Sequence, residues 1–262
     1  MRDCNPLGFL AYEGSSPSVS TIFKGNKMNK PLVVGYKGEI GSFILNGLLR
    51  VMPKALDIWC VDINETEEET EERIKVSDVI FICVPMEKTL DWIKKHKSLL
   101  EGKILIEQCS LKELICNDER IKDLNVKSMH ILFRPSGTPL KEDRRLALFD
   151  GQFDEETTRQ LLDITDSNLV TYSDAEEHDK EMAIQQALVH RTILLLGEEL
   201  GNCKGSTYVS KKIVELANRV KKGNVGLYQA IQDNRHLDEG LGRFLKGFDG
   251  FELKKHFYKI DL

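Results

Sequence analysis

The sequence has little of what marks a protein that binds nucleic acid or a membrane. Basic residues do not outnumber acidic ones: 37 Lys and Arg stand against 42 Asp and Glu among 262 residues, a net charge of −5. Such a chain has no basic excess to neutralise phosphates. No apolar run approaches the roughly 20 residues that a membrane-spanning helix requires. We therefore expect a small-molecule ligand and neither a nucleic-acid nor a membrane partner.

The sequence also lacks paired cysteine motifs. Its six cysteines show no C-x-x-C spacing, and several fall inside apolar, strand-like runs such as DIWCVDI and VIFICVP. This distribution predicts reduced, mostly buried thiols in a cytoplasmic protein, and no metal site. The cysteines are Cys4, Cys60, Cys83, Cys109, Cys116 and Cys203.

The first 27 residues are rich in Ser and Gly and contain no uninterrupted apolar core followed by a cleavage signal. A secretory signal peptide is therefore not expected. We interpret residues 1–27 as a disordered N-terminal extension, and Met28, directly before the first strand-like run, as an alternative start.

From Pro31 onward, short β-rich apolar runs alternate with helical patterns. The predicted strands are residues 32–36, 57–62, 78–84, 103–108, 126–132, 146–150 and 168–172. Apolar residues spaced three and four apart predict helices at 39–52, 87–100, 111–121 and 155–167. Strand–helix–strand alternation implies an α/β fold of the Rossmann type. We expect a doubly wound, mainly parallel sheet with helices on both faces over residues 28–172.

The chain changes character at Ser173. Ser173 and Glu176 have the spacing of a capping box, ahead of a long stretch without Pro or Gly. The segments 206–222, 224–235 and 237–247 also have helical patterns, with Gly between them. The long first helix is apolar over much of its circumference, which predicts burial against other helices and a second subunit. We expect residues 173–262 to form an all-α domain through which the chain makes a homodimer.

A Gly-rich turn follows the first predicted strand, in LVVGYKGEIGSFILNGLL (32–49). In the G-x-G-x-x-G fingerprint, glycines make a tight turn, let the backbone approach a pyrophosphate, and bring helix close to strand. Gly38 and Gly41 fit the second and third positions, but Tyr36 stands where the strict pattern has its first glycine. We expect the following residues of this turn to bind a dinucleotide: Gly35, Tyr36, Gly38, Glu39, Ile40 and Gly41.

Two further sites belong to the same prediction. Asp62 closes the second predicted strand about 20 residues past the turn, where an acid accepts hydrogen bonds from the adenosine ribose. A carboxylate there repels a 2′-phosphate, so NAD is favoured over NADP. Val84 and Pro85 end the third strand, at the carboxyl edge of the sheet where ligands bind in such folds.

Three polar segments go beyond a generic dinucleotide site. They are EQCSLKE (107–113), SMHILFRPSG (128–137) and EEHDKEMAIQQALVH (176–190). The first two follow or end strands that should finish at the same edge of the sheet as the Gly-rich turn, so their polar residues can converge on the nicotinamide.

With these segments the chain resembles the prephenate dehydrogenase family, particularly the branch fused to chorismate mutase in enteric bacteria. The resemblance runs from about Pro31 to Tyr228 and includes the Gly-rich turn, DVIFICVP, CSLKE and LFDGQFDEETTRQLLDI. Its most specific part is EHDKEMAIQQALVH, for the family's E-H-D-x-x-M-x-x-I-Q-A-L-x-H. No mutase domain is expected, because residues 1–27 leave no room for one.

The resemblance implies NAD-dependent oxidative decarboxylation of prephenate to 4-hydroxyphenylpyruvate, a step of tyrosine biosynthesis. It places His130 at the family's catalytic histidine, the general base, and Ser110 beside the substrate hydroxyl or the nicotinamide. Gln186 and His190 would project into the substrate pocket from one helix face. His178 and Asp179 are interpreted as structural residues at the start of that helix.

Two departures from the family pattern leave alternatives open. The family has H-P-M-F-G or a close variant after its catalytic strand, whereas this chain has Ile131, Leu132, Phe133 and Arg134 after His130. The arginine that usually binds a substrate carboxylate corresponds to Lys211, and Arg134 or Arg191 could compensate for the missing bidentate fork. One alternative is therefore an arogenate dehydrogenase or a relative acting on another cyclic acid. Another is a non-catalytic regulatory protein that binds a dinucleotide.

Overall fold

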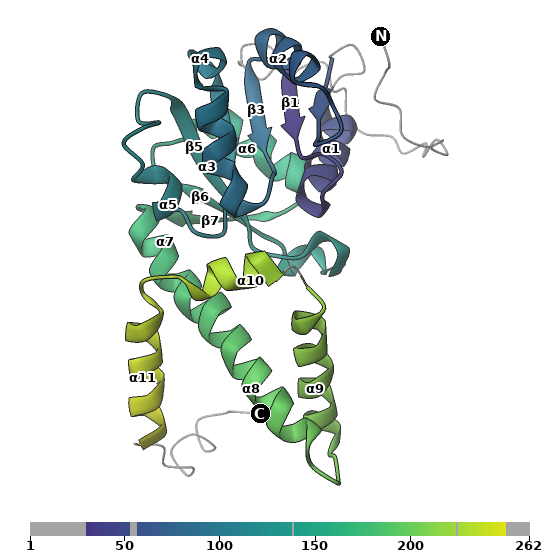
Figure 1. The fold of residues 1–262 in the computed structure, drawn as a ribbon, viewed down its shortest axis with the longest axis vertical. Coiled ribbons are helices and arrows are strands. Elements are labelled where there is room, and N and C mark those ends of the chain that lie inside the picture. The colour runs from purple at the N-terminus through teal and green to yellow at the C-terminus, as the bar shows by residue number, and fades with distance from the viewer. Residues whose placement is uncertain (1–29, 53–56, 138, 224, 250–262) are drawn as a thin grey trace, which may run out of the picture. The chain divides into compact units, whose positions relative to one another are not determined.

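The structure is a computed structural model that describes residues 30–52, 57–137, 139–223 and 225–249 (Figure 1). The interpretation of residues 1–27 lies outside this part of the chain. By internal contacts the chain divides into two compact units, Met1–Ala175 and Glu176–Leu262.

The first unit contains a seven-stranded sheet in the order β2-β1-β3-β4-β5-β6-β7. The strands are β1 (Pro31–Val34), β2 (Trp59–Val61), β3 (Val79–Ile82), β4 (Ile104–Glu107), β5 (Asn125–Ile131), β6 (Arg145–Phe149) and β7 (Asn168–Tyr172). Each lies within or at a predicted strand, and the Rossmann-type α/β prediction is confirmed.

One strand departs from the parallel arrangement that simple strand–helix alternation implies. β6 runs antiparallel to β5, whereas all the other neighbouring pairs in the sheet are parallel. Between β5 and β6 the described chain forms only two short 3-10 turns, Pro135–Gly137 and Lys141–Asp143. Parallel neighbours are usually joined by a crossover helix, and the described part of this connection contains none, so the chain returns antiparallel to β5.

The helices of the first unit follow the predicted pattern with three differences. They are α1 (Glu39–Val51), α2 (Glu67–Val76), α3 (Met86–Lys95), α4 (Lys97–Leu100), α5 (Glu113–Cys116) and α6 (Glu155–Thr165). The helix predicted over 87–100 is interrupted at His96, and the one predicted over 111–121 is reduced to α5. The sequence pattern did not predict α2, because only Thr70 and Ile74 of this acidic helix are buried.

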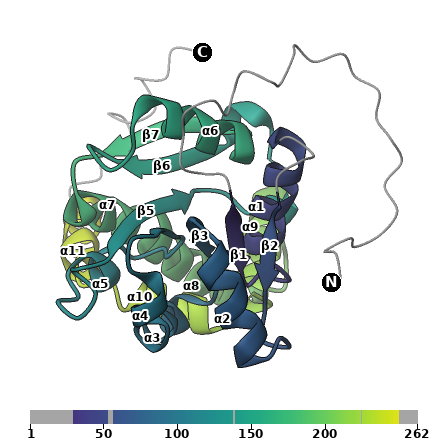
Figure 2. The same cartoon turned by 90° about the horizontal axis from the view of Figure 1, so that it is seen from above.

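The main core lies between the sheet and the pair α1 and α6. Buried Ile44, Leu45 and Leu48 of α1 join Leu161 and Ile164 of α6 in one cluster with residues of the sheet. The two helices approach closely, since a Cβ at Gly47 would lie 2.1 Å from the carbonyl oxygen of Ile164. Figure 2 shows α3 and α4 on the opposite side of the sheet from these helices.

The second unit is helical. Its first helical run consists of α7 (Ala175–Met182), a π-helical segment (Ala183–Leu188) and α8 (Val189–Gly201). The remaining helices are α9 (Tyr208–Lys221), α10 (Val225–Gln232) and α11 (Leu237–Asp249). α8 packs against α9, where a Cβ at Gly197 would lie 2.2 Å from the Cβ of Ala217. Among the described residues, no helix is long and apolar enough to cross a bilayer.

Candidate functional site

The turn after β1 has the geometry of a dinucleotide-binding turn. Gly35 has a φ of +79°, and a Cβ there would lie 2.7 Å from the carbonyl oxygen of Cys83. A Cβ at Gly41 would lie 2.1 Å from the carbonyl oxygen of Gly35. Both positions therefore require glycine, the first for its left-handed backbone and the second for the close approach of helix to turn. Gly35 takes over the role of the tight-turn glycine, although Tyr36 occupies its place in the strict pattern.

The N-terminus of α1 has no side-chain cap. Its N-cap is Gly38, which makes no side-chain capping hydrogen bond. The first backbone N–H groups of a helix have no partner within the helix, and together with the helix dipole they favour a phosphate. This cradle fits the diphosphate of a dinucleotide.

Asp62 lies at the carboxyl end of β2, beside the same turn. Its Oδ2 accepts the backbone N–H of Lys37 at 2.9 Å, and its Oδ1 accepts that of Ile63 at 2.8 Å. The Asp62 N–H in turn donates to Glu65 at 2.6 Å. These bonds hold the carboxylate next to the Gly-rich turn.

The end of β3 borders the turn from the other side. The Cys83 N–H donates to the Val34 carbonyl at 2.9 Å, and its own carbonyl faces Gly35. Val84 and Pro85 follow directly, and Pro85 is the N-cap of α3. Burial raises the pKa of the Cys83 thiol, so this thiol stays protonated. The structure thus brings the turn, Asp62 and the end of β3 together, as predicted from the sequence.

His130 lies in β5 and is 5% exposed. Its neighbours Met129 and Ile131 belong to the core cluster under α1 and α6. Because side chains alternate along a strand, His130 lies on the other face of the sheet, together with buried Ser128. His130 pairs with Ala147 of antiparallel β6.

A buried ion pair stands beside His130. The Lys112 ammonium donates to a carboxylate oxygen of Glu107 at 2.7 Å, and both side chains are 0% exposed. Lys112 also donates to the Met129 carbonyl at 2.8 Å, while the second oxygen of Glu107 accepts the Cys109 N–H at 2.7 Å. These bonds clamp the segment 107–112, which contains Ser110, against the residue that precedes His130. The family resemblance placed Ser110 in the site but did not identify this pair.

The turn after β5 is attached to the first turn of α1. The Arg134 Nε donates to the Glu39 carboxylate at 3.2 Å, and the Ser136 N–H donates to it at 2.9 Å. Phe133 contacts Phe43 of α1 edge-on, with ring centroids 5.6 Å apart. Partial burial raises the pKa of Glu39, but hydrogen bonds from Ser136 and the charge of Arg134 outweigh it and leave that pKa below its usual value.

The second unit holds the other predicted substrate residues. Gln186 lies in the π-helical segment and His190 in the first turn of α8. The His190 ring packs edge-on against Tyr228, with centroids 4.9 Å apart, and burial lowers the pKa of His190. In the part of the chain that the structure describes, the buried atoms Gln186 Oε1 and His190 Nδ1 have no hydrogen-bond partner. Lys211, in the first turn of α9, is exposed.

His178 and Asp179 form a buried pair at the start of this helical run. His178 Nδ1 and Asp179 Oδ1 lie 2.7 Å apart. The Asn234 side-chain amide donates to the Asp179 carbonyl at 2.7 Å and so connects α7 to the segment before α11. The arrangement agrees with the structural role expected for both residues.

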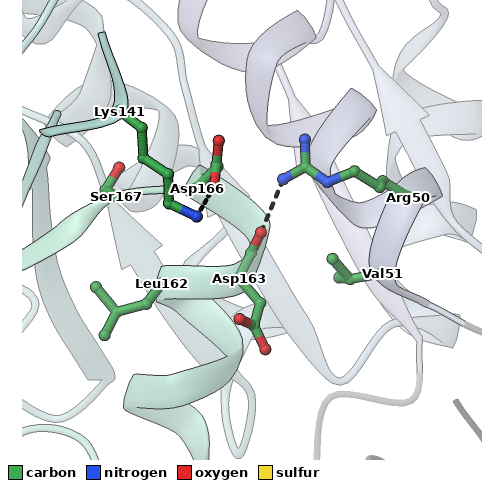
Figure 3. Close-up of a pocket in the computed structure, with 7 residues that line it drawn as sticks. All are labelled: Arg50, Val51, Lys141, Leu162, Asp163, Asp166 and Ser167. Carbon is green, nitrogen blue, oxygen red and sulfur yellow. Dashed lines mark hydrogen bonds and ion pairs between the residues drawn. The ribbon is translucent and has the colours of Figure 1, made fainter. Parts of the chain in front are cut away.

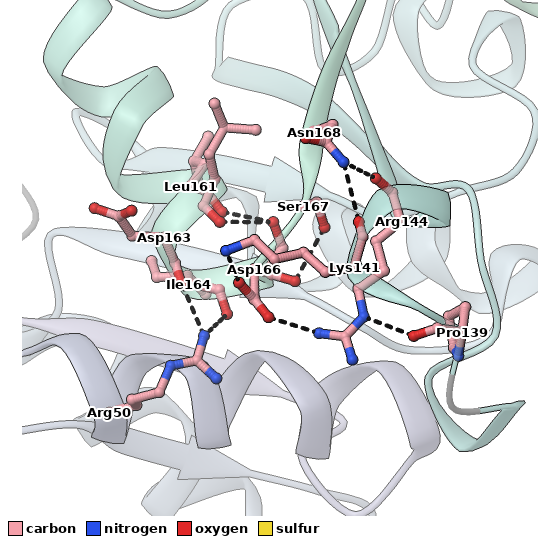
Figure 4. Close-up of polar contacts among 12 residues, drawn as sticks. Arg50, Pro139, Lys141, Arg144, Leu161, Asp163, Ile164, Asp166, Ser167 and Asn168 are labelled. Carbon is pink, nitrogen blue, oxygen red and sulfur yellow. Dashed lines mark hydrogen bonds and ion pairs between the residues drawn. The ribbon is translucent and has the colours of Figure 1, made fainter. Parts of the chain in front are cut away.

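A separate cavity of about 430 Å³ lies at the C-terminal ends of α1 and α6 (Figure 3). Arg50 donates to the carbonyls of Asp163 and Ile164, at 2.8 and 3.2 Å, and so caps α6. Asp166 accepts hydrogen bonds from Lys141 and Arg144 (Figure 4). The cavity is lined by none of the predicted site residues: its lining is Arg50, Val51, Lys141, Leu162, Asp163, Asp166 and Ser167. Its charged groups hold the helix ends together.

No protein-family model matches the sequence, and no curated protein matches it. Solved structures do. A prephenate dehydrogenase from Aquifex aeolicus, in complex with hydroxyphenyl propionate and NAD+, is 18% identical with a TM-score of 0.68, over 90% of this chain and 93% of that one. A protein from Corynebacterium glutamicum, provisionally named a prephenate dehydrogenase, is 16% identical with a TM-score of 0.64, over 86% and 83%. These likenesses establish a shared fold.

Proposed function

We propose that the protein is an NAD-dependent dehydrogenase of the prephenate dehydrogenase family, which converts prephenate to 4-hydroxyphenylpyruvate with loss of carbon dioxide. The observation that carries the proposal is the buried His130 beside the clamped segment of Ser110, in a unit whose Gly-rich turn fits a dinucleotide. The fold shared with the Aquifex aeolicus enzyme, solved with NAD+ and hydroxyphenyl propionate, supports it.

The first unit would hold the cofactor. The backbone from Gly35 to Gly41 would bind the diphosphate, including the N–H groups of Glu39 and Ile40, and Asp62 would accept the adenosine ribose hydroxyls. Tyr36, Val84 and Pro85 would border the cofactor at the carboxyl edge of the sheet. Bound NAD supplies the hydride acceptor of the reaction.

His130 would act as the general base. It would take the proton of the ring hydroxyl while hydride leaves the same ring carbon, after which loss of carbon dioxide makes the ring aromatic. General base catalysis of this kind contributes roughly 10²- to 10⁴-fold. Ser110 would donate a hydrogen bond to the oxygen or to the nicotinamide region and so fix the reacting atoms in line.

The second unit would supply substrate contacts. Burial lowers the pKa of His190, so its imidazole is neutral at pH 7 and serves as a hydrogen-bond donor and acceptor. Gln186 Oε1 and His190 Nδ1 are buried polar atoms for which a bound substrate offers partners. Lys211 would attract a substrate carboxylate as a point charge.

A cofactor-reduction assay tests the proposal. Prephenate and arogenate are each offered with NAD and with NADP, and formation of the reduced cofactor is followed by absorbance. We expect turnover of prephenate with NAD and its near-abolition in His130→Ala, with NADH binding unchanged in that variant. Normal turnover by His130→Ala would show that His130 is not the general base. Preference for arogenate would assign the alternative substrate, which has an amino acid side chain in place of the keto acid.

Dinucleotide binding without turnover of either acid would favour the non-catalytic alternative. In that case His130 would be a core histidine of β5. The readout of this outcome is a wild type that binds NADH in calorimetry but forms no reduced cofactor with either acid.

We also propose that the helical unit forms a homodimer. Its described helices expose large apolar side chains on α8 and α9, among them Leu195 at 61%, Val209 at 65% and Tyr208 at 76%. Such a concentration on neighbouring helices is typical of an interface. Light scattering should give twice the chain mass for wild type and the single chain mass for Leu195→Glu/Val209→Glu. A monomeric wild type would contradict the proposal.

A further inference from the structure

We infer that Arg134 is a cofactor-binding residue that donates to the diphosphate of the dinucleotide, and that Glu39 positions it there. This inference rests on the proposed function and deepens it, because it adds a contact to the proposed cofactor site. It differs from the role of substrate-carboxylate anchor that the sequence suggested for Arg134.

The position of the guanidinium is defined by α1. Glu39 is the first residue of α1, directly after the uncapped Gly38. The Arg134 Nε lies 3.2 Å from one carboxylate oxygen of Glu39, and the Ser136 N–H donates to the other at 2.9 Å. The edge-on contact of Phe133 with Phe43 fixes the same turn against the next turn of α1. The cation therefore stands at the helix end that the diphosphate would occupy.

The guanidinium keeps donors for a ligand. Its contacts to Glu39 run through Nε, and among the residues that the structure describes neither terminal nitrogen of Arg134 has a hydrogen-bond partner. The side chain is 63% exposed, so these nitrogens are accessible. A planar guanidinium matches phosphate oxygens bidentately, which makes arginine suited to this contact.

The charge of Glu39 explains why a cation is needed there. Hydrogen bonds from Ser136 and the charge of Arg134 leave the pKa of Glu39 below its usual value despite partial burial, so this carboxylate is ionised at neutral pH. An ionised carboxylate on the first turn of a diphosphate-binding helix repels the ligand. Arg134 neutralises it and places a positive charge beside the helix N–H groups.

The described contacts of Arg134 decide between the two roles. Among the residues that the structure describes, its side-chain hydrogen bonds go to Glu39, in the first turn of α1, the turn to which the proposed function assigns the diphosphate. The contact with Glu39 therefore favours the cofactor role.

The test measures binding of cofactor fragments, which needs no turnover. Calorimetry gives the Kd of NADH, of ADP-ribose and of adenosine for wild type, Arg134→Ala, Glu39→Gln/Arg134→Ala and the control Arg159→Ala. Arg159 is a matched surface arginine of the first unit, 58% exposed and paired with Glu156. Thermal melts of all four proteins verify folding.

We expect Arg134→Ala to weaken NADH and ADP-ribose about 10- to 100-fold, the range of a charged hydrogen bond. Adenosine, which lacks the diphosphate, should bind all four proteins alike. The double variant should recover part of the loss, because the uncompensated carboxylate is gone, and Arg159→Ala should match wild type.

Unchanged Kd values for NADH and ADP-ribose in Arg134→Ala would overturn the inference. A raised KM for the acid substrate in Arg134→Ala, with cofactor binding intact, would also overturn it and would show that Arg134 binds the substrate. A protein that binds NADH through Arg134 but oxidises neither acid would overturn the proposed reaction and leave this inference standing. A wild type that binds no NADH would overturn both.

Discussion

Replacing Lys112 with Met should destabilise the first unit far more than the loss of an ordinary surface lysine. The variant removes the ammonium but leaves Glu107, which is 0% exposed, without its cation. Breaking a buried pair by removing one partner costs about 3–5 kcal/mol, because the remaining charge is desolvated and uncompensated. The hydrogen bond from Lys112 to the Met129 carbonyl is lost as well.

The double variant Glu107→Gln/Lys112→Met separates the charge from the packing. It leaves no buried ion, and glutamine keeps a carbonyl oxygen that can accept the Cys109 N–H. We therefore expect it to be more stable than Lys112→Met by about 2 kcal/mol. The control is Lys75→Met, which breaks an exposed pair with Glu71 (54% and 42% exposed) and should cost less than about 1 kcal/mol.

Urea unfolding followed by tryptophan fluorescence is the assay. Both tryptophans of the sequence, Trp59 and Trp92, lie in the first unit, in β2 and α3, so the signal reports on the unit that contains the ion pair. A loss of stability in Lys112→Met no larger than that in Lys75→Met would refute the reasoning. So would a double variant less stable than Lys112→Met.

Three other predictions follow from the site geometry. Gly41→Ala should abolish NADH binding measured by calorimetry, since its Cβ would lie 2.1 Å from the Gly35 carbonyl oxygen; wild-type affinity would contradict the assigned turn. Asp62→Asn should raise the affinity for NADPH relative to NADH, because the carboxylate that repels a 2′-phosphate is gone. Burial lowers the pKa of His190 in the folded protein, so as the pH falls the unfolded chain takes up this proton at a higher pH than the folded protein does. The free energy of unfolding should therefore fall as the pH drops below about 6.5, the pKa of histidine in an unfolded chain. Thermal melts from pH 8 to pH 5 should show a smaller fall in His190→Gln than in wild type.

The strands and the Gly-rich turn could be predicted because their signals are local. Apolar runs between helical patterns marked all seven strands of the sheet. Glycine at 35 and 41 marked backbone positions that no other residue can adopt without a clash. The carboxyl edge, where Asp62 and the end of β3 meet the turn, then follows from the parallel arrangement.

Three parts of the fold escaped the pattern for physical reasons. α2 buries only Thr70 and Ile74, so it has almost no apolar periodicity to detect; its capping box, Thr66 with Glu69, is its main signal. β6 reverses direction because short 3-10 turns replace a crossover helix. The π-helical segment Ala183–Leu188 has no signature in an unbroken apolar helix pattern.

The candidate site shows the same division. Its chemistry-bearing residues, His130 and Ser110, came from a motif resemblance, and their roles remain predictions. The contacts that fix the surroundings of these residues were not predicted from any motif. Lys112 donates to Glu107, five residues earlier in the chain, and to the Met129 carbonyl, seventeen residues later.

The sequence by itself determined the alternation of strands and helices in the first unit, the glycines of the turn and the helical character of the second unit, because these depend on residue type and short-range spacing. Only the tertiary structure decided the partner of Arg134. Glu39 lies 95 residues away from it, and their contact exists because α1 packs over the sheet beside the end of β5. A contact across that separation depends on how the elements pack, which no local pattern encodes.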